Sequence, residues 1–166
     1  MNSRLQQLQK ALTSVIEDMS PAELQRHPEG KWSAREILEH LYLTYTNTTK
    51  GLEKCLAAAK PMGRKPSVKD RVASVLVTKF GYLPEGRESP ERAKPRGTPI
   101  EQVVAELTKE IQRMDDAIAA CEKRHGKRAK LLDHPVLGPL NGNEWRGFHC
   151  SHGRHHIKQI QRLRQN

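Results

Sequence analysis

The feature that most constrains this sequence is an apolar stripe, repeated four times, with the three- and four-residue spacing of an α-helix. It occupies residues 3–19, the segment from Ser33 to Leu56, the segment from Thr98 to Cys121, and the segment from Asn143 to Arg164. Apolar residues at this spacing share one helical face, which must be buried against another element. No segment shows the alternation that is typical of a half-buried strand. The sequence therefore predicts an all-α fold.

Three short motifs predict where helices begin. Each places serine or threonine three positions before glutamate, which is the spacing of a capping box; they are Ser20-Pro21-Ala22-Glu23, Ser33-Ala34-Arg35-Glu36 and Thr98-Pro99-Ile100-Glu101. A proline at the second position of two of them suits the first helical turn. The first motif predicts a short helical turn, and the other two predict the starts of the second and third long helices.

Residues 60–96 form a long connection between these two helices. We expect a short helix from Val68 to Phe80 and an irregular chain over residues 81–97, where proline and glycine are frequent. The predicted architecture is an up-down four-helix bundle with a long connection between helices two and three. A chain of 166 residues is expected to form a single domain, residues 1–166.

Positive charge is concentrated in the same connection. The chain carries 29 Lys and Arg against 19 Asp and Glu, a formal net charge of +10, and residues 60–96 hold ten of the cations against four acidic residues. The connection has few aromatic residues that can stack on bases, so we favour a solvated segment over a nucleic-acid surface. Its arginines and lysines can also recognise an anionic substrate or cofactor.

Composition excludes several classes of protein. No apolar run approaches the length of a membrane span, and the first residues lack the apolar stretch of a secretory signal. We therefore expect a soluble cytoplasmic protein with no membrane partner. Cys55, Cys121 and Cys150 are too few and too scattered for a disulfide framework, and we expect them to be free thiols.

Histidines carry the strongest functional signal. Four of the eight fall within residues 149–156. Because successive residues on an α-helix are about 100° apart, three of them share the apolar face of the last helix and the fourth lies at its edge; the inward set is His149, His152 and His156. Buried imidazoles are unfavourable unless their nitrogens find partners, and a divalent metal is one partner for several rings.

The spacing of these histidines predicts a metal site. His152 and His156 are one helical turn apart, which lets two ring nitrogens reach one ion, and the third ligand must come from another helix. His40, beside the apolar stripe of the second long helix, is the candidate. His149 is an alternative ligand, a hydrogen-bonding partner of a ligand, or a satisfied core residue. Gln159 either orients a ligand through a hydrogen bond or is an ordinary surface glutamine.

Two segments resemble the DinB-like superfamily. Residues 32–41, WSAREILEHL, are similar to its W-S-x-x-E-[IL]-x-x-H-[LI] motif, and HPVLGPL at residues 134–140, with the histidine-rich segment 144–160, resembles its closing region. The resemblance implies a four-helix bundle with a long second connection and a homodimer. It also implies one nickel or zinc ion held by three histidines, which correspond to His40, His152 and His156.

The resemblance also frames the functional hypotheses. Known activities in the superfamily include thiol transferases that use bacillithiol or mycothiol, a mycothiol-dependent maleylpyruvate isomerase, and proteins described as metal-dependent hydrolases. The leading hypothesis is a metal-dependent thiol transferase or hydrolase that acts on a small-molecule substrate, with a low-molecular-weight thiol as cosubstrate for the transferase. The alternative is a non-catalytic metal-binding stress-response protein that contacts nucleic acid through its basic surface. No residue is assigned a catalytic role, and the sequence leaves open whether the protein is an enzyme.

Overall fold

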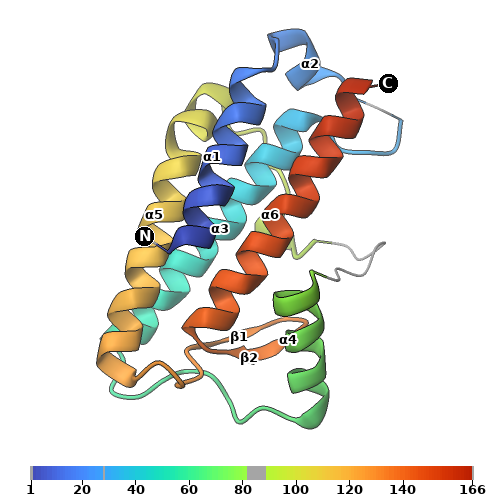
Figure 1. The fold of residues 1–166 in the computed structure, drawn as a ribbon. Helices are drawn as coiled ribbons and strands as arrows, with labels where there is room; N and C mark the ends of the chain where they lie inside the picture. Colours follow the sequence, from blue (N-terminus) through green and yellow to red (C-terminus); the bar gives the residue numbers. More distant parts are fainter. Residues whose placement is uncertain (1, 28, 82–88, 166) are drawn as a thin grey trace.

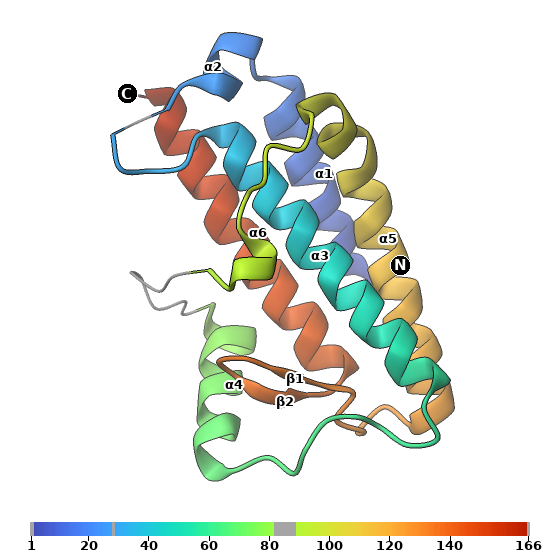
Figure 2. The same ribbon diagram turned by 180° about the vertical axis from the view of Figure 1, so that it is seen from behind.

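Four long helices lie side by side in the computed structural model, which describes residues 2–27, 29–81 and 89–165 (Figures 1 and 2). The long helices are α1 (Ser3–Glu17), α3 (Ala34–Ala57), α5 (Ile100–His125) and α6 (Gly142–Gln165). The shorter elements are α2 (Pro21–Gln25), α4 (Val68–Phe80), the 3-10 turn η1 (Glu91–Ala93), and the strands β1 (Leu132–His134) and β2 (Gly138–Leu140). The predicted all-α fold class is confirmed.

The long connection carries the chain back along the length of the molecule. Figure 1 shows that α3 ends at the end of the molecule where α4 and the strands lie, whereas α5 begins at the opposite end, where α2 lies. The chain therefore reverses direction between α1 and α3 and between α5 and α6, but α3 and α5 run the same way. An up-down bundle implies that successive helices run in opposite directions. This alternation is broken between α3 and α5, because the long connection between them crosses the molecule and permits parallel neighbours.

Side-chain capping explains where three of the helices begin. Ser20, Ser33 and Ser67 each accept a hydrogen bond from the backbone three residues later, and the acidic side chain at that position bonds back to the serine backbone. The capping boxes predicted at Ser20 and Ser33 are confirmed. The one predicted at Thr98 is wrong: the N-cap position of α5 is Pro99, one residue later, and no side chain caps it. The hydroxyl of Thr98 donates to Glu39.

Two connections differ from the sequence-based expectation. The segment expected to be irregular, residues 81–97, contains η1, and its residues 82–88 lie outside the described residues. The connection before α6, where no strand was expected, pairs β1 with β2 in antiparallel register, with His134 opposite Gly138. A φ of +72° at Gly138, which glycine adopts without strain, permits this tight reversal.

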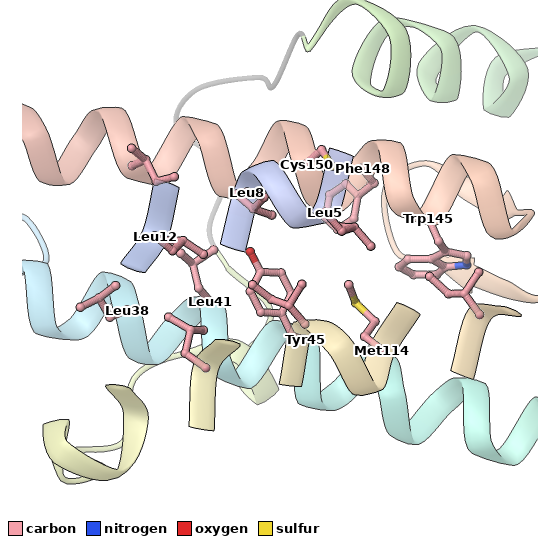
Figure 3. Packing of buried hydrophobic residues seen from close by; sticks show 14 of the residues in the cluster. Leu5, Leu8, Leu12, Leu38, Leu41, Tyr45, Met114, Trp145, Phe148 and Cys150 are labelled. Carbon is pink, nitrogen blue, oxygen red and sulfur yellow. The ribbon is translucent and has the colours of Figure 1, made fainter. Parts of the chain in front are cut away.

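The apolar faces of the four long helices meet in one core. Figure 3 shows Tyr45 extending from α3 toward Leu8 on α1, with Met114 and Trp145 further along the same layer. Tyr45 and Leu8 are almost completely buried. All three cysteines are free, as predicted, and all three are buried. No helix within the described ranges is long and apolar enough to cross a membrane.

Gly153 lets α6 pack closely on α1 and α3. A β-carbon at this position would lie 2.6 Å from Cδ1 of Leu8 and 2.9 Å from the hydroxyl of Tyr45. Both neighbours are held in the densely packed core, where side chains have little room to move. Since His152 is the preceding residue, this close packing also sets the position of that histidine.

We expect the substitution Gly153→Ala to destabilise the protein. Alanine is favoured in a helix by about 1 kcal/mol, but overpacking of a core costs about 1–3 kcal/mol, so the free energy of unfolding should fall in a urea titration. Gly51→Ala in α3 is the matched control, because its β-carbon would meet only the partly exposed side chain of Leu132. That variant should be neutral or more stable. A Gly153→Ala variant as stable as Gly51→Ala would contradict the packing argument.

Candidate metal centre

Three histidines from two helices meet near the middle of the molecule. His40 lies on α3, and His152 and His156 lie one turn apart on α6. The Nε2 atom of His152 is 3.2 Å from Nε2 of His40 and 3.1 Å from Nε2 of His156. One ligand atom from each ring lies within 4.8 Å of the other two. The structure thus brings together the three residues that the sequence singled out as ligands.

Hydrogen bonds on the far side of two rings fix their orientation. Nδ1 of His40 is 2.8 Å from the carbonyl oxygen of Ala93, and Nδ1 of His156 is 2.7 Å from Oε1 of Gln159. An oxygen of a carbonyl or an amide only accepts, so each Nδ1 must carry the proton. In the neutral rings, the lone pair is therefore on Nε2, which points at His152.

Burial keeps all three rings neutral. Desolvation lowers the pKa of His40, although the bond to Ala93 partly opposes this effect. Burial, followed by the neighbouring His40, lowers the pKa of His156 to about 3. The pKa of His152 lies well below its usual value, first through burial and then because His156 and His40 are so close. At neutral pH the rings can therefore act as nitrogen donors.

The geometry and the donor set fit a divalent metal. Two nitrogens that each lie about 2.1 Å from one zinc ion at a tetrahedral angle are about 3.4 Å apart, which is close to the separations between the Nε2 atoms. Two lone pairs directed at a third nitrogen need a shared positive centre, and a single N–H of His152 serves two acceptors poorly. The Nδ1 atom of His152 is buried and has no hydrogen-bond partner within residues 2–27, 29–81 and 89–165, so hydrogen bonds from these residues do not satisfy this ring.

Gln159 and His149 have different roles. Gln159 makes the contact with His156 that the orienting hypothesis requires. His149 is fully buried and is not a member of the three-histidine group. Its ring stacks on Trp145, with centroids 5.6 Å apart, and meets Tyr45 edge-on at 5.3 Å. The structure therefore places His149 in the aromatic core, and burial lowers its pKa to about 3.

Sequence reasoning missed Glu39, which holds the long connection beside the histidines. Its buried carboxylate accepts hydrogen bonds from the backbone N–H groups of Arg96, Gly97 and Thr98 and from the Thr98 hydroxyl, at distances of 2.6–3.1 Å. Burial alone would raise the pKa of Glu39, but these bonds outweigh it and keep the pKa low. A charged residue within the buried face of a predicted helix was the available signal.

A cavity of about 1420 Å³ opens around the three histidines. Its apolar lining includes Trp32 and Phe148. The ring of Trp32 lies 5.1 Å from that of His40, and the ring of Phe148 stacks on that of His152 at 5.3 Å. The volume is sufficient for a small organic molecule, which would lie against the exposed side of the histidines.

Comparison with known proteins identifies the family of this chain. Residues 4–160 match the DinB superfamily, and this range covers most of the chain, including all three histidines. Searches of curated proteins and of solved structures found no match.

We expect the stability of the metal-free protein to fall as the pH decreases from 7 to 5. The unfolded chain takes up protons on histidine near pH 6.5, whereas the folded-state pKa of His149 is about 3 and that of His134 about 4. The unfolded state therefore binds more protons in this range, and acid favours unfolding. Replacing His149 with glutamine should reduce the pH dependence by roughly 2 kcal/mol in urea titrations at the two pH values. An unchanged dependence would contradict the burial of a neutral ring at this position.

We expect Glu39→Gln to release the connection and disturb His40. The amide replaces one acceptor oxygen with an NH₂ group that faces backbone N–H donors, so the free energy of unfolding should fall by about 3 kcal/mol. The population of the Nδ1–H tautomer of His40 should also fall, and nitrogen NMR of the imidazole ring measures this population. Glu110→Gln, at a buried carboxylate of α5 that pairs with Arg113, is the control and should leave the His40 signals unchanged. Unchanged His40 signals in Glu39→Gln would contradict the link.

Proposed function

The chain belongs to the DinB superfamily, and from this premise we propose that it is a metal-dependent enzyme whose centre is formed by His40, His152 and His156. One observation carries the proposal: the Nε2 atoms of three neutral imidazoles converge at the wall of a large cavity. A site with three protein ligands leaves coordination positions for a reactant, which is typical of catalytic rather than structural metal sites.

We propose nickel or zinc as the ion and transfer or hydrolysis as the reaction. An ion held there would lower the pKa of a thiol or a water molecule and make it an effective nucleophile at neutral pH. The three nitrogens are the histidine donors that suit these metals. In a transferase the nucleophile would be a low-molecular-weight thiol that acts as cosubstrate, and in a hydrolase it would be water.

The chain supports this chemistry in two ways. The carbonyl of Ala93 and the amide of Gln159 hold the rings of His40 and His156 in the orientation and tautomer that direct Nε2 to the centre. Aromatic rings beside the histidines, such as Phe148 stacked on His152, exclude water from one side and strengthen electrostatic interactions there.

Elemental analysis of protein purified without a histidine tag tests the site. We expect one equivalent of nickel or zinc in the wild type and its loss in His40→Ala and His152→Ala, each checked for native helix content by circular dichroism. His27→Ala is the control, because this exposed histidine pairs with Glu36 and lies outside the cluster. A wild type that binds no metal after reloading, or variants that retain it, would contradict the proposal.

Activity distinguishes the two proposed reactions. Turnover of an electrophilic substrate that requires an added thiol and disappears in His152→Ala would identify a transferase. Thiol-independent hydrolysis with the same loss would identify a hydrolase. A metal-loaded protein with neither activity over a broad screen would favour the non-catalytic metal-binding alternative.

A further inference from the structure

The part of the cavity wall that η1 contributes is bound to α3 through two consecutive residues, Arg92 and Ala93. The carbonyl oxygen of Arg92 accepts a hydrogen bond from Nδ2 of Asn47 at 2.9 Å, and the next carbonyl, that of Ala93, accepts the bond from His40. Figure 2 shows this turn lying against α3 on the side of the molecule that faces the viewer. The backbone of Arg92 therefore has a defined position one residue from the group that orients a proposed ligand.

The side chain of Arg92 differs from other arginines of the chain. Arg64 and Arg146 bind carboxylates through their guanidinium groups. Arg92 is an exposed residue that lines the cavity, and its guanidinium makes no ion pair or hydrogen bond with any residue of the described ranges. Its charge is felt across the cavity: burial is the main cause of the lowered pKa of His134, and Arg92 adds to it.

Carboxylates within the cavity do not neutralise this charge. Glu36 and Asp133 are the acidic residues that line its described part, together with the basic residues Lys31, Arg92, Lys94 and Arg162, of which Lys94 pairs with Glu91. Glu36 is engaged by the backbone and hydroxyl of Ser33 and by His27, and Asp133 accepts a bond from the backbone of Arg64. A concave surface with an excess of one charge raises the local concentration of oppositely charged solutes.

The rest of the lining is largely apolar. Trp32, Leu137, Phe148 and Leu163 contribute to the wall around the histidines. In such a pocket the apolar lining binds the body of a small molecule, and a few well-placed polar groups set its orientation. The guanidinium of Arg92 is suited to orient such a molecule, because its planar fork matches the two oxygens of a carboxylate or phosphate.

We propose that the substrate of this centre is a small organic anion, and that Arg92 binds its carboxylate or phosphate group while the apolar lining holds its body beside the three histidines. This inference rests on the proposed function, since it takes the histidine cluster as the reaction site. It assigns Arg92 to substrate binding, separate from the groups that hold the metal.

Binding of three matched probes tests the proposal. The probes are 3-phenylpropionate, 2-phenylethyl phosphate and the neutral 3-phenylpropionamide, titrated at low ionic strength by calorimetry into metal-free and zinc-treated protein. We expect the wild type to bind at least one anion about tenfold more tightly than the amide, and Arg92→Gln to abolish that preference without changing the affinity for the amide. Arg154→Gln is the matched control, because it removes the same charge from an exposed position of α6 that does not line the cavity.

Each result has one interpretation. An anion preference that is lost in Arg92→Gln and kept in Arg154→Gln supports the proposal, and the preferred anion identifies the group as carboxylate or phosphate. No anion preference in the wild type, or one that survives in Arg92→Gln, overturns it. The anion preference is also measured in the metal-free protein, so this test does not depend on zinc binding. A protein that binds no zinc would overturn the metal-dependent function and leave the anion preference to be judged separately.

Discussion

The buried carboxylate of Glu39 determines where the long connection meets the helices. A carboxylate removed from water requires several hydrogen-bond donors, and here they come from Arg96, Gly97 and Thr98. Because His40 is the next residue on α3, the same attachment brings the carbonyl of Ala93 to its Nδ1 atom. The start of α5, the orientation of His40 and the cavity wall at η1 therefore depend on one charge.

The features that the sequence predicted correctly depend on neighbours along the chain. Helical periodicity predicted the four long helices, and the capping boxes at Ser20 and Ser33 form because their partners are three residues away. The pairing of His152 with His156 follows from one helical turn in the same way. Choosing His40 required only the inference that a buried histidine pair needs a donor from another helix.

What the sequence did not reveal depends on contacts between distant segments. The bond from His40 to Ala93 joins residues that are 53 positions apart, and backbone carbonyls leave no signal in a side-chain pattern. The predicted cap at Thr98 failed because α5 begins one residue later, after Pro99, where Thr98 and its neighbours bind the distant Glu39. The parallel course of α3 and α5 also depends on how the long connection folds back, which periodicity does not encode.

Burial and positive charge act in the same direction in this cavity. Removing imidazoles from water disfavours their protonated form, and the adjacent Arg92 disfavours it further at His134. Metal ions bind only unprotonated nitrogens, so an environment that excludes protons keeps the donors of His40, His152 and His156 available below the pH at which free histidine is charged. The positive charge of Arg92, which disfavours protonation of His134, attracts anions for the same electrostatic reason. Burial therefore keeps the three rings ready to bind a metal, and the positive charge favours an anionic substrate beside them.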